Sequence, residues 1–121
     1  SGYLLLAQNL FEKKITSTGS WNFGPPREDC ISVKEILERI NKQSKYQIYW
    51  EELNSKHFYE APTLMLDSSK AKKFLGWHPK WSLNKSLQMT IDWYEKWIDK
   101  KNMYDLTLSQ ISEYYGKSIL E

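Results

Sequence analysis

The stretch LDSSKAKKFLGWHPKW, residues 66–81, decides the local fold around which the rest of this chain is organised. Asp67 or Ser68 offers a side-chain oxygen that can cap the start of a helix. Three apolar residues follow at the spacing of one helix face: Ala71, Phe74 and Leu75. Gly76 can adopt the left-handed conformation of a helix end, and Pro79 prevents the helix from resuming. The stretch therefore predicts a short helix, a stop and a pinned loop.

The composition limits the classes of protein that this chain can represent. Its 121 residues suffice for one domain with one core, and 17 Lys+Arg against 15 Asp+Glu leave a net charge of +2. So small a charge gives no reason to expect a nucleic-acid partner. The single cysteine, Cys30, excludes an internal disulfide framework. The apolar run of residues 3–7 is too short for a membrane span or a signal peptide. We expect a soluble, cytoplasmic protein.

Helical patterns occupy most of the chain. Residues 1–14 predict a helix whose first turn is apolar nearly all round, which indicates burial by a neighbour missing from this chain. Ser32 and Glu35 form a capping-box pattern for a helix that ends near residue 41. Ser82 is expected to cap the longest helix, residues 83–98. A second capping-box pattern at Thr107 predicts a final helix through residue 115.

Three short segments are typical of strands. Residues 20–23 and 46–50 alternate in polarity, and residues 63–66 form a third extended segment that leads into the helix of the opening stretch. Helices and short strands in alternation predict an α/β fold, mostly helical, with a small sheet of a few short strands.

Few side chains in this sequence suit catalysis or ligand binding. His57 and His78 are the only histidines, and neither has metal-ligand spacing to a cysteine or to the other histidine, so we predict no metal site. Arg27 follows Gly-Pro-Pro in a loop after an expected strand, where its guanidinium suits a phosphate. The alternative is a surface arginine beside Glu28 and Asp29. The sequence contains neither a Rossmann glycine loop nor a Tyr-x-x-x-Lys pair.

The motif D-x-S-K-A-x-x-x-L-G-W-x-P, preceded by SGYLLLAQNLFEK and WNFGP, resembles the C-terminal segment of extended short-chain dehydrogenase/reductases that act on nucleotide sugars. The resemblance runs from residue 1 to about residue 97. It implies that residues 1–121 form the small substrate-binding lobe, built partly from two short parallel strands. It also implies that NAD is bound by an N-terminal Rossmann domain absent from this chain.

For the activity, the resemblance implies a nucleotide-sugar dehydratase, a lyase of bacterial surface-polysaccharide (O-antigen) biosynthesis. A CDP-linked sugar is favoured over GDP- or dTDP-linked ones, which related dehydratases or epimerases would use. The family's Tyr/Lys chemistry would lie upstream of residue 1, so we predict no catalytic residue here and no activity for this chain alone. The expected partners are the nucleotide sugar, the chain's own Rossmann domain and, in the full-length enzyme, further copies of it.

The resemblance also indicates substrate contacts in the loop that contains His57, Tyr59 and Glu60. Glu60 would accept hydrogen bonds from ribose hydroxyls, and Tyr59 would donate to a phosphate or stack on the base. The alternatives are a solvated carboxylate and a packed aromatic ring. Related epimerases carry an arginine near this loop, whereas this chain has none after Arg39. Residues in another part of the chain must therefore neutralise the phosphate charge.

The composition also suits a protein of a different functional class. The chain has six Trp and eight Tyr, and aromatic residues in such numbers suit a partner surface as well as a core. A free-standing, non-enzymatic helical interaction module would use them in this way.

Overall fold

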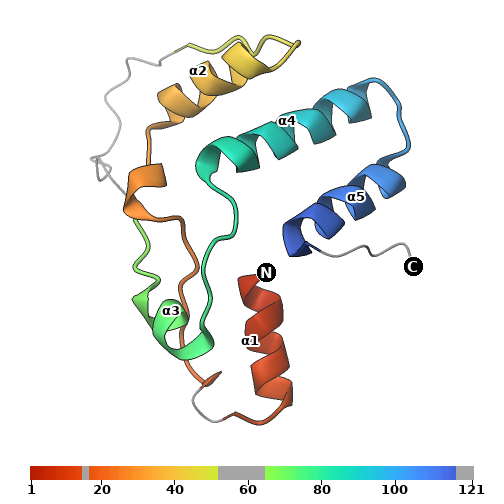
Figure 1. Ribbon diagram of the computed structural model, residues 1–121. Helices are drawn as coiled ribbons and strands as arrows, with labels where there is room; N and C mark the ends of the chain where they lie inside the picture. Colours follow the sequence, from red (N-terminus) through yellow and green to blue (C-terminus); the bar gives the residue numbers. More distant parts are fainter. Residues whose placement is uncertain (15–16, 52–64, 117–121) are drawn as a thin grey trace. The chain divides into compact units, whose positions relative to one another are not determined.

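The computed structural model describes residues 1–14, 17–51 and 65–116 and divides the chain into two compact units. Unit 1 comprises Ser1–Cys30 and His57–Pro79, and unit 2 comprises Ile31–Lys56 and Lys80–Glu121. The regular elements (Figure 1) are all helical: α1 (Gly2–Phe11), the 3₁₀ helix η2 (Arg27–Asp29), α2 (Val33–Gln43), α3 (Ser69–Leu75), α4 (Leu83–Ile98) and α5 (Met103–Tyr115).

The predicted α/β fold is wrong for the part of the chain that the structure describes. Its regular structure consists of five α-helices and one 3₁₀ helix, without a strand or a sheet. Neither residues 20–23 nor residues 46–50 are strands, and residues 65–66 are irregular. Residues 63–64 lie outside the described ranges. Alternating polarity alone does not make a strand, because a strand needs a neighbouring backbone to complete its hydrogen bonds.

Side chains supply the hydrogen bonds that a neighbouring strand would have given to these two segments. In unit 1, the carbonyl oxygen of Ser20 accepts from Lys70, and the N–H of Gly24, the residue that follows the segment, donates to Ser68. In unit 2, the Asn41 side chain donates to the carbonyl oxygen of Ile48 at 2.9 Å and accepts from its N–H at 2.7 Å. Asn41 thus bonds both backbone groups of Ile48, much as a paired strand would.

Three aromatic rings of unit 1 pack in a row. Phe23 lies edge-on to Tyr3 of α1 at 5.3 Å and edge-on to Trp77 at 5.1 Å, between ring centroids. The Trp77 indole N–H donates to the Ser1 hydroxyl at 3.1 Å. Gly2 is buried against the Phe23 ring, and a Cβ atom at that position would overlap the ring. A glycine at the start of α1 therefore allows this close packing.

Helix α3 ends as the sequence predicts. Gly76 is left-handed with φ +62°, and the N–H of Trp77 donates to the carbonyl oxygen of Ala71, six residues earlier. Its beginning differs in detail from the prediction. Ser68 is the N-cap residue but makes no side-chain cap, and the Asp67 carboxylate accepts from the N–H of Ser69 at 2.9 Å. The Ser68 hydroxyl is directed instead to Gly24.

In unit 2, the predicted caps of α2 and α4 are confirmed. The Ser32 hydroxyl accepts from the N–H of Glu35, whose carboxylate accepts from the N–H of Ser32. Ser82 caps α4, which packs against both α2 and α5 and buries Leu87 and Ile91.

The predicted start of the final helix is wrong. Asn102 caps α5 by accepting from the N–H groups of Tyr104 and Asp105, so the helix begins at Met103. Thr107 lies within the helix, where its hydroxyl donates to the carbonyl oxygen of Met103. The helix ends at Gly116, with φ +67°, as predicted. An earlier asparagine cap therefore overrides the capping-box pattern.

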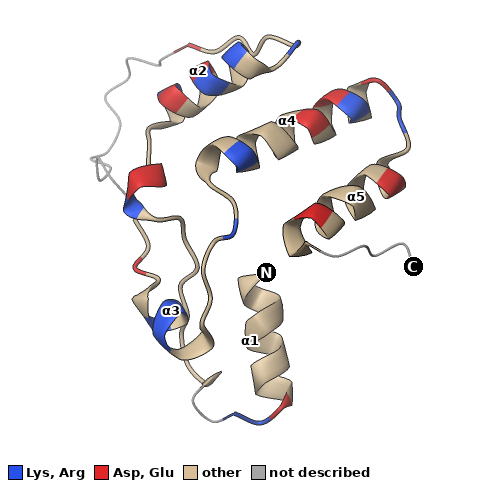
Figure 2. Cartoon of the chain, in the orientation of Figure 1, with Lys and Arg blue, Asp and Glu red and all other residues tan. Residues whose placement is uncertain are grey.

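Helix α1 presents a large apolar surface. It ends at Phe11 rather than near residue 14, because Lys13 has a left-handed φ of 55°. Tyr3 is 78% exposed, Leu4 69% and Phe11 89%. Figure 2 shows no charged residue along α1 itself. These three side chains are therefore not covered by the described residues.

Candidate functional site

Arg27 is the one predicted substrate-binding residue that lies in the described ranges. It opens η2, directly after the extended Pro26, whose φ and ψ are −67° and 160°. Two backbone hydrogen bonds close the turn, from the N–H of Asp29 to the carbonyl oxygen of Pro26 and from that of Cys30 to the carbonyl oxygen of Arg27. The Arg27 side chain is exposed and forms no hydrogen bond or ion pair with the described residues. Its guanidinium is therefore accessible to an anion.

The Arg27 turn is anchored to the start of α3 through Ser68. The N–H of Gly24 donates to the Ser68 hydroxyl at 2.8 Å, and that hydroxyl lies 3.5 Å from the carbonyl oxygen of Gly24, to which it donates. Ser68 is only 6% exposed. A Cβ atom on Gly24 would lie 3.1 Å from the Cβ of Leu66, closer than ordinary van der Waals contact. The absence of a side chain at Gly24 thus allows the two segments to meet.

A second contact, two residues further along, joins α3 to the same segment. The Lys70 ammonium donates to the carbonyl oxygen of Ser20 at 2.9 Å and lies 4.2 Å from the centroid of the Trp21 ring. The Trp21 indole N–H donates to the carbonyl oxygen of Ser17, which is buried. The Lys70 ammonium is therefore held within the protein by one hydrogen bond and one cation–π contact.

All three motifs that carry the family resemblance meet in unit 1. The SGYLLLA segment contacts Phe23 of the WNFGP motif through Tyr3, and Trp77 of the D-x-S-K-A-x-x-x-L-G-W-x-P motif through Ser1. The WNFGP motif in turn contacts the start of that third motif through the hydroxyl of Ser68. These three stretches are distant in sequence, and packing of each against the others explains why their residue types occur together.

The structure does not test the other predicted site residues. His57, Tyr59 and Glu60 lie outside the described residues. His78 is exposed and follows the packed Trp77. Beside the Ser68 anchor, hydrogen bonds from Ser69 lower the pKa of Asp67, so that carboxylate has a structural role at the start of α3.

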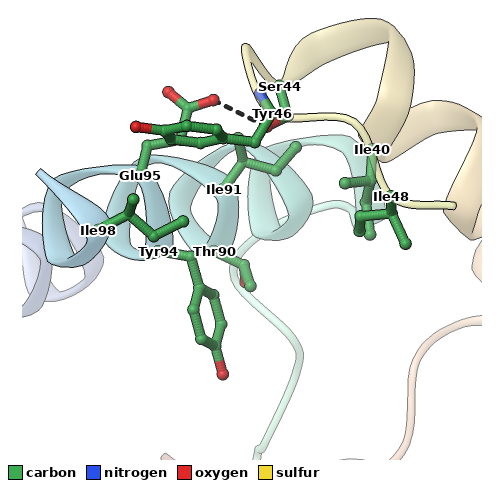
Figure 3. Close-up of a pocket in the computed structure, with 9 residues that line it drawn as sticks. All are labelled: Ile40, Ser44, Tyr46, Ile48, Thr90, Ile91, Tyr94, Glu95 and Ile98. Carbon is green, nitrogen blue, oxygen red and sulfur yellow. Dashed lines mark hydrogen bonds between the residues drawn. The ribbon is translucent and has the colours of Figure 1, made fainter.

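Unit 2 contains an apolar pocket of about 350 Å³ (Figure 3) between α2, the segment after it and α4. Sequence reasoning did not predict this pocket, although the alternation of residues 46–50 was a signal, since Tyr46 and Ile48 both line it. The full lining is Ile40, Ser44, Tyr46, Ile48, Thr90, Ile91, Tyr94, Glu95 and Ile98.

The chemistry of this pocket does not suit a phosphate. Its lining includes no lysine or arginine, and its one carboxylate is engaged. Glu95 accepts from the Ser44 hydroxyl at 2.8 Å and from the N–H of Lys45 at 2.7 Å. A nucleotide's pyrophosphate would meet a carboxylate and isoleucine side chains there, without a compensating cation.

The described residues contain no group of three or more His, Cys, Asp or Glu side chains placed to hold a metal ion. They also contain no helix with the length and apolar character needed to cross a membrane.

The resemblance to nucleotide-sugar enzymes, carried by the three motifs that pack together, is confirmed by comparison with curated proteins. The chain is 35% identical over 114 residues to the CDP-glucose 4,6-dehydratase of Salmonella typhimurium. The match covers 94% of this chain and 32% of that enzyme, so the chain spans about a third of the length of its curated relative. No protein-family model matches the chain.

Proposed function

We propose that this chain is the C-terminal, substrate-binding part of a nucleotide-sugar 4,6-dehydratase that acts on CDP-glucose. The observation that carries the proposal is the 35% identity to a CDP-glucose 4,6-dehydratase over nearly the whole chain. The mutual packing of the three motifs in unit 1 supports it. The reaction would convert CDP-glucose to CDP-4-keto-6-deoxyglucose with net loss of one water.

Arg27 is the residue of the described structure that best suits the substrate. Its guanidinium is exposed on a turn held by backbone hydrogen bonds. A planar guanidinium forms two parallel hydrogen bonds to a phosphate, and each charge-assisted bond is stronger than a neutral one. We assign Arg27 to the pyrophosphate of the nucleotide sugar, with Glu60 at the ribose, Tyr59 at the phosphate or base and His57 beside them in the same loop.

The residues of this chain do not fit NAD. The sequence lacks the glycine-rich turn between a strand and a helix that cradles a dinucleotide pyrophosphate, and the described residues contain no strand that could precede one. In the proposal, NAD and the catalytic groups belong to a Rossmann domain elsewhere in a longer protein. This chain's residues bind and orient the sugar nucleotide.

The remaining parts of the proposal follow from the resemblance to the extended short-chain dehydrogenase/reductases. The full-length enzyme would be a cytoplasmic, NAD-dependent homo-oligomer. Its 4-keto product would supply the deoxy sugars of bacterial surface polysaccharide, the O-antigen. The chain's nearest partner would be its own Rossmann domain.

The test is calorimetric titration of the full-length protein with CDP-, GDP-, dTDP- and UDP-glucose. We expect measurable heat of binding and turnover with CDP-glucose. Preferential binding and turnover of GDP- or dTDP-glucose would replace the proposal by a related dehydratase or epimerase. Absence of binding to all four, in a folded protein, would favour the helical interaction module.

A further inference from the structure

The Ser68 hydroxyl is linked to Arg27 through the backbone of Gly24, although Ser68 and Arg27 are far apart in the sequence. Ser68 bonds both backbone groups of Gly24, and only Pro25 and Pro26 separate Gly24 from Arg27. A proline ring fixes φ near −65°, and a following proline restricts the residue before it to extended conformations. The connection from the anchor to Arg27 therefore has little conformational freedom.

The turn beyond the prolines is held in the same way. The carbonyl oxygen of Pro26 accepts from the N–H of Asp29 at 3.0 Å and from the Cys30 thiol at 3.6 Å. The carbonyl oxygen of Arg27 accepts from the N–H of Cys30 at 3.1 Å. The Arg27 backbone is thus fixed on both sides, and the anchor on the N-terminal side is Ser68.

We infer that Ser68 is a positioning residue, whose hydroxyl fixes the Gly24-Pro25-Pro26 connection and so places the Arg27 backbone, from which the guanidinium reaches the anion. For its effect on ligand binding, this inference rests on the proposed function, which places Arg27 at the pyrophosphate. Without the hydroxyl, the N–H of Gly24 loses its partner, and the turn is held only by its own internal bonds. The backbone of the turn that carries Arg27 would then sample several conformations, and the entropy cost of ordering it would oppose binding of the anion.

The first experiment measures the turn itself in the full-length protein. Ser68→Ala should increase amide hydrogen exchange in residues 24–31 about two- to tenfold, the range expected for loss of one hydrogen bond. Exchange in α2 should not change. Ser69→Ala is the matched control, because it removes a hydroxyl from the adjacent, exposed residue, whose side chain bonds Asp67 rather than Gly24. If exchange in residues 24–31 is the same in Ser68→Ala as in the parent, the inference is overturned.

The second experiment measures calorimetric affinity for CDP in Ser68→Ala, Arg27→Gln and the double variant. Ser68→Ala should weaken CDP binding about two- to tenfold in the parent and have no further effect once Arg27 is replaced. An equal effect of Ser68→Ala in both backgrounds would overturn positioning through Arg27. Faster exchange in Ser68→Ala, together with an Arg27→Gln variant that binds CDP like the parent, would support the anchor and reject the proposed phosphate role of Arg27.

Discussion

The Ser68 hydroxyl accepts a hydrogen bond from the N–H of Gly24 at 2.8 Å and so joins two segments that are 44 residues apart. Ser68 occupies the variable position after Asp67 in the D-x-S-K-A-x-x-x-L-G-W-x-P motif, and Gly24 belongs to the WNFGP motif, so one side chain links two of the three motifs of the family resemblance. A serine placed just before a helix usually caps that helix. Here its hydroxyl bonds another segment instead of capping the helix.

The 121-residue chain, on its own, should not convert CDP-glucose even with added NAD. It contains no glycine loop for a dinucleotide and no Tyr-x-x-x-Lys pair. The measurement is absorbance of the 4-keto product in alkali, with the full-length enzyme as positive control. Product formed by the pure chain at a rate above the no-protein blank would contradict this prediction.

Gly76→Val should lower the thermal stability of the chain. Gly76 has φ +62°, where a non-glycine residue costs roughly 1–2 kcal/mol and a β-branched one is especially strained. No atom lies near the place of a Cβ there, so the effect would be one of backbone strain rather than steric overlap. Gly76→Asn is the matched control, since asparagine tolerates this conformation better. Equal melting midpoints for the parent and the valine variant would argue against the left-handed helix end.

Glu60→Ala in the full-length enzyme should weaken CDP-glucose binding and leave the fold intact. Loss of a charge-assisted hydrogen bond costs about 1.5–3 kcal/mol, or about ten- to a hundredfold in affinity. Glu60→Gln keeps the side-chain size and one acceptor oxygen, so it should show an intermediate effect in calorimetry. A dissociation constant within about twofold of the parent in the alanine variant would leave Glu60 as a solvated carboxylate.

Acid should destabilise unit 2 partly through Asp99. The Asp99 carboxylate accepts from the Lys45 ammonium at 2.5 Å and from the Tyr46 hydroxyl at 2.9 Å. These two bonds lower its pKa below 3.8 in the folded chain. Because the folded-state pKa is the lower one, the stabilisation is present above pH 3.8 and is lost as the pH falls through the folded-state pKa.

The measurement for Asp99 is the urea midpoint of the parent and of Asp99→Asn between about pH 5 and pH 2. The parent should lose more stability than the variant over this range. Glu38→Gln, an exposed change on α2, is the control and should follow the parent. Parallel curves for the parent and Asp99→Asn would show that the Lys45 and Tyr46 bonds contribute nothing to stability.

Helix α1 should cause the isolated chain to self-associate. Tyr3, Leu4 and Phe11 are all more than two-thirds exposed, and exposed apolar patches of this kind commonly find another surface. Leu4→Lys/Phe11→Lys should reduce the mass measured by light scattering at high protein concentration. Gln8→Lys adds a charge to the same helix without removing an apolar side chain and serves as the control. A parent chain that stays monomeric at about millimolar concentration would contradict the prediction.

Local signals predicted the ends of several helices correctly. The Ser32 capping box, the Ser82 cap and the stops at Gly76 and Gly116 all occur where the sequence places them. Each is decided by bonds within a few residues or by the φ preference of one glycine, so sequence alone suffices. The start of α5 was missed because two cap signals lie close together, and Asn102 precedes Thr107.

The sequence by itself determined the helical segments, most of their caps and, through three motifs, the likeness to a nucleotide-sugar dehydratase. Only the tertiary structure decided that residues 20–23 and 46–50 are not strands, that Ser68 bonds Gly24, and that Tyr46 and Ile48 line a pocket. The physical reason is the range of the interactions. A cap or a helix stop is satisfied by neighbours in sequence, whereas an extended segment depends on a partner that folding brings from far away, here a side chain such as Asn41 rather than a strand.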